Sequence, residues 1–197
     1  PGDHWLPPDN WQETPEPKLA HRTSPTNMGL SLLANLGAYD LGYASVGRVL
    51  QRSTEALATM RRLERFRGHF YNWYDTLSLQ PLPPAYVSTV DSGNLAGHLF
   101  TLRAGLLGLA DQPVVPPRCF QGLRDTLGCA LGESREGRDE ATLRTLRHAI
   151  SAAIVSPPTT LQPQRRPALA MVALRLLGRQ GGCRTPRSRR AAGRHTP

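Results

Sequence analysis

The sequence lacks any apolar run of about 20 residues, the length that spans a bilayer. The longest apolar stretch, residues 168–177, is interrupted by Arg175. The first residues also lack the basic segment and following apolar run of a signal peptide. We therefore expect no direct membrane insertion by this segment, which should itself be soluble and cytoplasmic.

Cysteine is scarce, and its three positions have no metal-ligand spacing: Cys119, Cys129 and Cys183. An odd number of unpatterned cysteines favours reduced thiols in a cytosolic setting. His21, His69 and His98 are widely separated and have no cysteine or carboxylate at ligand spacing, so we predict no metal site. The sequence has neither a glycine-rich phosphate loop nor a Gly-x-Ser-x-Gly elbow. No cofactor is expected.

Acidic residues are absent from residues 179–197, whereas the net charge of the whole chain is +9. This segment holds six arginines: Arg179, Arg184, Arg187, Arg189, Arg190 and Arg194. The rest of the chain is nearly neutral, so the basic character belongs mainly to a tail that we expect to be disordered. Nonspecific binding of nucleic acid by the tail is an alternative with a steep salt dependence. Because no aromatic platform accompanies the arginines, we predict no specific nucleic-acid partner.

The pattern of proline and leucine predicts an all-α fold in three parts. Residues 1–22 are a proline-containing lead-in arm, residues 23–178 a helical domain, and residues 179–197 the basic tail. Trp5 and Trp11 should pack the arm onto the domain. Helices are predicted at about 25–39, 45–64, 91–109, 117–131, 139–155 and 167–178.

Apolar residues at helical spacing predict which side chains are buried. The predicted buried stripes are Leu30, Leu33 and Leu36 in the first helix, Val46, Val49, Leu50, Leu57, Met60 and Leu63 in the second, and Leu95, Leu99, Leu102 and Leu106 in the third. Ser24 followed by Pro25 marks the first helix start, and Asp91 or Ser92 the third. Gly29 and Gly37 lower helix propensity, which suggests close packing against a neighbour.

Residues 67–90 interrupt the helical pattern, and a loop of this length in a compact domain is usually functional. We expect a structured loop containing a small hairpin, with an extended run at 86–90. Its first part holds Phe70, Tyr71, Asn72, Trp73, Tyr74 and Asp75. Sugar sites combine aromatic platforms with hydrogen-bonding side chains. The alternative is that the aromatic rings are a plug packed onto the helices.

Asp75 and Asp91 are the carboxylates best placed for acid–base chemistry. Glycosyl transfer by carboxylates needs two such groups about 5–9 Å apart. The alternatives remain that Asp75 closes a turn and that Asp91 is an N-cap. Small polar residues at 23–27 and 91–94 precede two helices separated by one other helix. These helix starts should therefore collect hydroxyls and N–H groups on one common face.

Four segments resemble the middle region of cyclic β-1,2-glucan synthases. They are WLPPDNWQE at 5–13, AHRTSPTN at 20–27, RFRGHFYNWYDT at 65–76 and VSTVDSGNLAGHL at 87–99. The similarity covers about residues 4–110 and is weak from 111 to 178. These synthases are large bacterial inner-membrane proteins, so the resemblance implies a position on the cytoplasmic side of that membrane within a parent protein.

The resemblance implies that residues 23–178 are an incomplete (α/α)6 barrel from the domain that cyclises the glucan by transglycosylation. It implies a β-1,2-glucan chain and the remaining domains of the parent synthase as partners. Asp91 and Asp75 become the catalytic candidates. The implied substrate-binding residues are Tyr71, Asn72, Trp73, Tyr74, Thr23, Asn94 and His98. The principal catalytic Glu is expected outside the matching part, so we expect a fragment that is inactive alone. The alternative is a noncatalytic helical scaffold or a carbohydrate-binding module.

Overall fold

A computed structural model describes residues 2–113, 115–133 and 140–156. Within these ranges the chain is mostly helical, with short two-residue strands. The helices are α1 (Pro25–Asp40), α2 (Val46–Arg62), α3 (Thr89–Leu109), α4 (Arg118–Glu133) and α5 (Glu140–Val155). The prediction of a helical fold is confirmed at this level. The predicted helix at 167–178 and the tail at 179–197 lie outside the described residues.

Serine residues cap the first three helices. Ser24 accepts a hydrogen bond from the Asn27 N–H, and Ser45 accepts one from the Arg48 N–H. Ser88 accepts one from the N–H of Asp91, so α3 begins two residues before the predicted start. Asp91 is therefore not the N-cap, and the extended run predicted at 86–90 ends where α3 begins. An acidic residue in the first turn favours the helix through its dipole.

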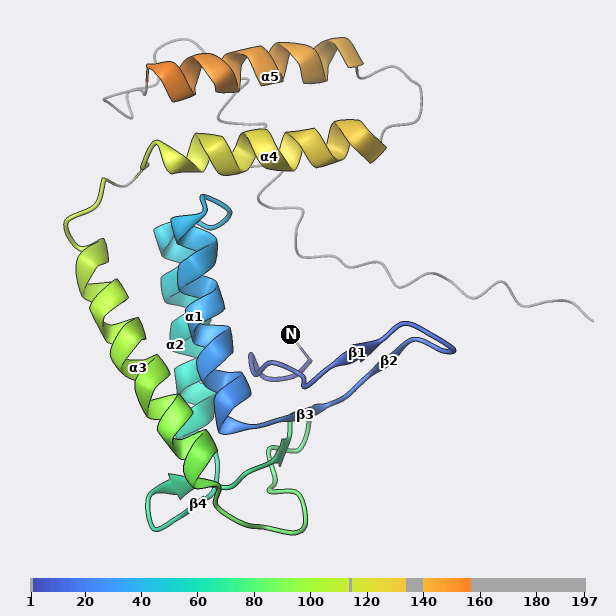
Figure 1. Ribbon diagram of the computed structural model, residues 1–197, viewed down its shortest axis with the longest axis vertical. Coiled ribbons are helices and arrows are strands. Elements are labelled where there is room, and N and C mark those ends of the chain that lie inside the picture. Colours follow the sequence, from blue (N-terminus) through green and yellow to red (C-terminus); the bar gives the residue numbers. More distant parts are fainter. Residues whose placement is uncertain (1, 114, 134–139, 157–197) are drawn as a thin grey trace, which may run out of the picture. The chain divides into compact units, whose positions relative to one another are not determined.

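Helices α1 and α3 pack side by side in parallel (Figure 1). Near their starts, the Asn94 amide donates to Thr26 Oγ1 at 3.1 Å. Further along, Gly29 lies directly against His98, and Gly105 against Leu36. The absence of a side chain at each glycine allows the two backbones to approach closely. The predicted close packing at Gly29 is confirmed, whereas Gly37 has no neighbour within contact distance, so that prediction is wrong.

Gly29→Ala should destabilise the fold by about 1–3 kcal/mol, because the new Cβ would meet the His98 ring in a packed interface. Gly37→Ala is the matched control in the same helix. A Cβ at Gly37 meets nothing, so alanine should stabilise α1 by up to about 1 kcal/mol through its higher helix propensity. Urea denaturation of both variants measures the difference. Equal effects would contradict the close contact between α1 and α3.

The core lies among α1, α2, α3, the N-terminal arm and the aromatic-rich loop at 67–88, called the aromatic loop below. Its buried members are Leu6, Met28, Leu32, Ala56, Met60, Leu63, Tyr74, Leu79, Leu95 and Leu102. Val49, Met60 and Leu63 follow the predicted stripe of α2, and Leu95 and Leu102 that of α3. Leu30 and Leu50 were predicted to be buried but are exposed. Both predictions are wrong, and in α1 the buried face is formed instead by Met28, Leu32 and Tyr39.

In the described part of the chain, three two-stranded antiparallel pairs accompany the helices. They are β1 (Trp11–Gln12) with β2 (Lys18–Leu19), β3 (Arg22–Thr23) with β6 (Tyr74–Asp75), and β4 (Arg65–Phe66) with β5 (His69–Phe70). The β4–β5 pair is the predicted small hairpin, and its turn residues Arg67 and Gly68 have positive φ. In the arm, Trp5 packs against the core as predicted. Trp11 is 55% exposed, so its predicted packing is wrong.

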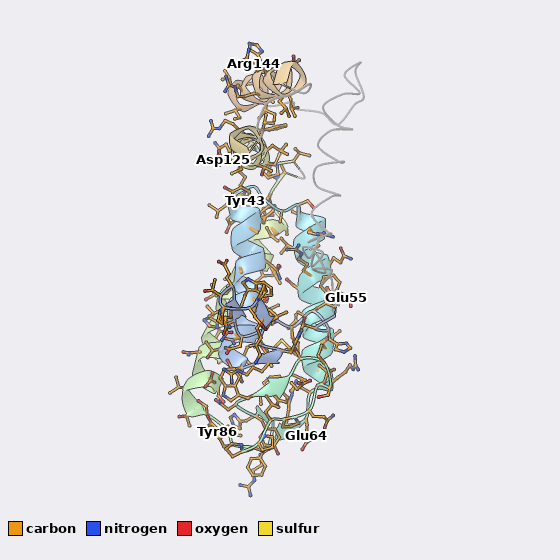
Figure 2. The ribbon with its side chains drawn as sticks, turned by 90° about the vertical axis from the view of Figure 1, so that its right-hand side faces the viewer. Tyr43, Glu55, Glu64, Tyr86, Asp125 and Arg144 are labelled. Carbon is orange, nitrogen blue, oxygen red and sulfur yellow. The ribbon has the colours of Figure 1, made fainter. Side chains whose placement is uncertain are left out.

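Helices α4 and α5 pack against each other. Both begin and end within two residues of the bounds predicted from the sequence. The turn after α1 meets the start of α4, where the backbones of Gly42 and Gly122 touch. Nearby, the Tyr43 hydroxyl lies 3.5 Å from Asp125 Oδ2 (Figure 2). None of the helices in the described ranges has the length and apolar character to cross a membrane.

Candidate functional site: a carboxylate between two helix starts

The β3–β6 pair brings the aromatic loop to the start of α1. Thr23 pairs with Tyr74 and Arg22 with Asp75, and β3 runs directly into the Ser24 cap (Figure 1). Trp73 precedes β6 and is the diagonal neighbour of Arg22 on the same face of the pair. Residues about fifty positions apart in the sequence are thus fixed beside one helix start.

Asp91 lies between the starts of α1 and α3. Thr26 Oγ1 donates to its Oδ1 at 2.7 Å, and the amide of Asn94 donates to the same Thr26 hydroxyl. The two helix starts predicted to share a face therefore do so. Burial raises the pKa of Asp91, but hydrogen bonds from Ser88, Thr26 and Ser24 outweigh it and leave the pKa below 3.8. The carboxylate is ionised at neutral pH.

Asn72 connects Asp91 to the aromatic loop. In the amide orientation that satisfies its neighbours, Asn72 donates to Asp91 Oδ2 at 2.8 Å. Its oxygen accepts from the Trp73 indole N–H at 2.6 Å and from the Tyr86 hydroxyl at 2.8 Å. Asn72 is buried, whereas Tyr86 is exposed at the same end of the helices as Glu64 (Figure 2). The network thus runs from a buried amide to an exposed phenol.

Arg22 and Asp9 complete this site, and the sequence analysis gave neither of them a role. The Arg22 guanidinium lies 4.8 Å from the centre of the Trp73 ring. Asp9 Oδ2 accepts from Arg22 at 2.9 Å, and Asp9 Oδ1 accepts from the Asn27 amide at 3.1 Å. Thr26, Tyr86 and Ser88 were also missed. Their only signal in the sequence was their place within or beside the segments at 5–13, 20–27 and 87–99 that resemble the synthases.

Asp75 belongs to a separate turn. Its Oδ1 accepts from the N–H groups of Leu77 and Ser78 at 2.9 and 2.6 Å, and from the Ser78 hydroxyl at 2.9 Å. Hydrogen bonds from Ser78, the backbone one first, lower the pKa of Asp75. This geometry matches the alternative in which Asp75 closes a turn. Within the described residues, the side chain of Asp75 makes no hydrogen bond to the Asp91 network, although its backbone pairs with Arg22.

Tyr74 is fully buried and is part of the core. Its hydroxyl donates to the Glu64 carbonyl at 2.6 Å and accepts from the Tyr71 N–H at 2.8 Å. Burial raises its pKa to about 12. A ring without exposed surface cannot stack on a ligand, so the prediction of Tyr74 as a stacking residue is wrong. The position of Tyr74 matches the alternative in which the aromatic rings are a plug packed onto the helices.

The remaining predicted residues divide between the network and the core. Thr23 is fully buried, and its hydroxyl has no partner in the described part of the chain. His98 packs its ring against Gly29, with Nδ1 buried. Tyr71 is half-buried and makes an edge contact with Tyr74. Among the predicted binding residues, only Asn72, Trp73 and Asn94 join Asp91 in one network.

The site is built from hydrogen-bonding side chains whose polar atoms bond one another. Asp91 is an acceptor at neutral pH, while Asn72, Asn94 and Thr26 carry both donor and acceptor capacity. A general acid at neutral pH needs a raised pKa, and the pKa of both Asp75 and Asp91 is lowered instead. At neutral pH both carboxylates can therefore accept a hydrogen bond or a proton, but they cannot act as the proton donor.

The amino-acid sequence of the chain is similar to that of one curated enzyme. The chain is 39% identical over 168 residues to cyclic beta-(1,2)-glucan synthase NdvB of Rhizobium meliloti strain 1021. The chain corresponds to part of a cyclic β-1,2-glucan synthase. The similarity covers 83% of this chain and 6% of the NdvB synthase. It confirms the resemblance that the four motifs indicate. No family model matches the chain.

Proposed function

We propose that this chain is the glucan-binding part of the glycosyl-transferring domain of a cyclic β-1,2-glucan synthase. The similarity to NdvB supports the parent enzyme, and the hydroxyl-binding network around Asp91 supports contact with its glucan. In this proposal, glucan hydroxyls bind Asp91, Asn94 and Thr26, and a sugar ring stacks on Trp73. The other domains of the synthase are its partners, on the cytoplasmic side of the membrane.

We further propose that the described helices, α1 to α5, are part of an (α/α)6 barrel. Support comes from the parallel packing of α1 and α3 with α2 between them in the sequence, since alternate helices of such a barrel are parallel neighbours. Apolar side chains on the outer faces of these helices also support it, among them Phe100, which is 75% exposed, and Leu107 and Leu30. Faces of this kind usually contact further protein.

Glycosyl transfer in this proposal is shared with other elements of the synthase. Asp91 is fixed by donors from α1 (Thr26) and from the loop before β6 (Asn72), and it is ionised. It can therefore orient a sugar hydroxyl or accept its proton. The proton donor to the leaving oxygen must come from a group with a raised pKa, which neither Asp91 nor Asp75 has. We therefore propose that the chain binds glucan but does not cleave it alone.

Trp73→Ala should weaken binding of linear β-1,2-glucan oligosaccharides about 5–30-fold, because stacking on an aromatic ring contributes about 1–2 kcal/mol. Titration calorimetry measures the affinity, and urea denaturation measures the free energy of unfolding of the same variant. Trp11→Ala is the matched control, because Trp11 is exposed and outside the network. Unchanged affinity of Trp73→Ala would eliminate the stacking role.

A noncatalytic scaffold is the second candidate function. The observation in its favour is that protein donors already occupy both oxygens of Asp91, while Arg22 covers one face of Trp73. In a scaffold, these contacts serve to join α1, α3 and the aromatic loop. This function predicts no measurable glucan binding by the wild-type chain, together with a large loss of stability in Asp91 variants.

A further inference from the structure

The carboxylate of Asp9 joins the arm to β3 and to the first turn of α1. Its Oδ2 accepts from Arg22 Nε at 3.1 Å and from Nη2 at 2.9 Å, and its Oδ1 accepts from the Asn27 amide at 3.1 Å. The Asp9 N–H also donates to the Ala20 carbonyl at 3.1 Å, which fixes the backbone of the arm. Asp9 therefore contacts β3 directly and the first turn of α1.

The Arg22 side chain is half exposed, so its guanidinium is held mainly by the Asp9 carboxylate. The exposed fraction of the Arg22 side chain is 50%, whereas that of Asp9 is 19%. A long side chain at such a position loses considerable conformational entropy when it is fixed. Two hydrogen bonds to one ionised oxygen offset that loss, because charge-assisted bonds are stronger than neutral ones. The same bonds fix the guanidinium over the Trp73 ring.

Trp73 is thereby held from two directions. Its indole N–H donates to Asn72, which fixes the edge of the ring, and Arg22 covers one of its faces. A cation over an aromatic face is attracted by the ring quadrupole, by about 0.5–1 kcal/mol at exposed sites. With one face covered, only the opposite face of the indole can receive a ligand.

We propose that Asp9 is a positioning residue for the glucan site, acting through Arg22 on Trp73. It holds the guanidinium against one face of the indole, so the ring is preorganised with its other face toward the sugar. Asp9 itself does not touch the glucan. The proposal takes its ligand, the glucan, from the proposed function. The contacts from Asp9 to Arg22 and from Arg22 to Trp73 do not depend on that function. Preorganisation of this kind raises affinity by reducing the ordering that binding requires.

A double-mutant cycle tests the proposal, with binding of linear β-1,2-glucan oligosaccharides measured by calorimetry. Asp9→Asn keeps the size of the side chain and an acceptor for Asn27, but it loses the charge that holds Arg22. We expect about fivefold weaker binding in the wild-type background and no further loss in the Trp73→Ala background. Asp125→Asn, an exposed change outside the network, is the control. An equal loss from Asp9→Asn in both backgrounds would overturn the proposal.

Arg22 variants, followed by the NMR signal of the Trp73 indole N–H, test the position of the ring without any glucan. They therefore test the role of Asp9 separately from the proposed function. Arg22→Gln removes the same cation from the same ring face, so it should shift the Trp73 indole N–H signal in the same direction as Asp9→Asn. Arg22→Lys should restore affinity only in part, because lysine cannot match the guanidinium fork. If the wild-type chain binds no glucan, the proposed function fails, and the resonance still reports on positioning. An unmoved Trp73 resonance in both Asp9→Asn and Arg22→Gln overturns the role of Asp9.

Discussion

Asp91→Ala is expected to lower the free energy of unfolding by about 3 kcal/mol, measured by urea denaturation at pH 7. The substitution removes a charged acceptor and leaves Thr26 and Asn72 without their partner. Hydrogen bonds to charged groups contribute about 1.5–3 kcal/mol each, and unpaired buried donors add a penalty. Asp75→Asn is the control, because its turn is at the surface and should cost about 1 kcal/mol. Equal losses in the two variants would contradict the central position of Asp91.

The effect of Asp91 should also depend on pH in a defined direction. Its pKa in the folded protein is below the ordinary 3.8, so its contribution is fully present above pH 4. The contribution is lost as the pH falls from about 4 through the lower folded value. Asp91→Asn should therefore flatten the acid limb of the stability curve. Asp3 and Asp75 also have lowered pKa values and will retain part of that limb.

Tyr74→Ala should be at least as damaging, with a loss of about 3–5 kcal/mol. The ring is fully buried, and its removal opens a cavity between β6 and the helices. It also leaves the Glu64 carbonyl and the Tyr71 N–H without the hydroxyl they share. Thermal unfolding followed by circular dichroism measures the loss in melting temperature.

Tyr74→Phe distinguishes the two parts of that loss. It keeps the ring and removes only the hydroxyl, so about 1–2 kcal/mol should be lost. If Tyr74 were a surface stacking residue, both variants would leave stability nearly unchanged and would weaken glucan binding instead. That result would contradict the buried position of the ring.

Local signals in the sequence were enough to predict the helices. Ser24 with Pro25 marks the start of α1, and leucine spacing predicts the buried face of α3. The start of α3 was placed too late because Ser88 lies in a stretch that reads as extended. Capping depends on the backbone angles of one residue, and neighbouring polar residues do not reveal which of them adopts those angles.

The site was only partly predictable, for a different reason. Asn72 and Trp73 were predicted from the aromatic and amide composition of the loop, and Asp91 from its place at a helix start. The loop composition could not separate Trp73 from Tyr74, since adjacent residues in an extended segment point to opposite sides and the sequence does not say which side is the core. Asp9 and Arg22 were missed because their partners are distant in the sequence.

The contacts between α1 and α3 have a consequence for how this segment can change in length. Thr26 with Asn94, Gly29 with His98, and Leu36 with Gly105 are separated in sequence by the same interval to within one residue. Deleting one residue inside either helix turns everything beyond it by about 100° and puts these pairs on different faces. Residues added in the exposed turn at Arg67 and Gly68 lengthen all three intervals equally, so the pairs keep their register. Natural variation in length should therefore collect in that turn and avoid the two helices.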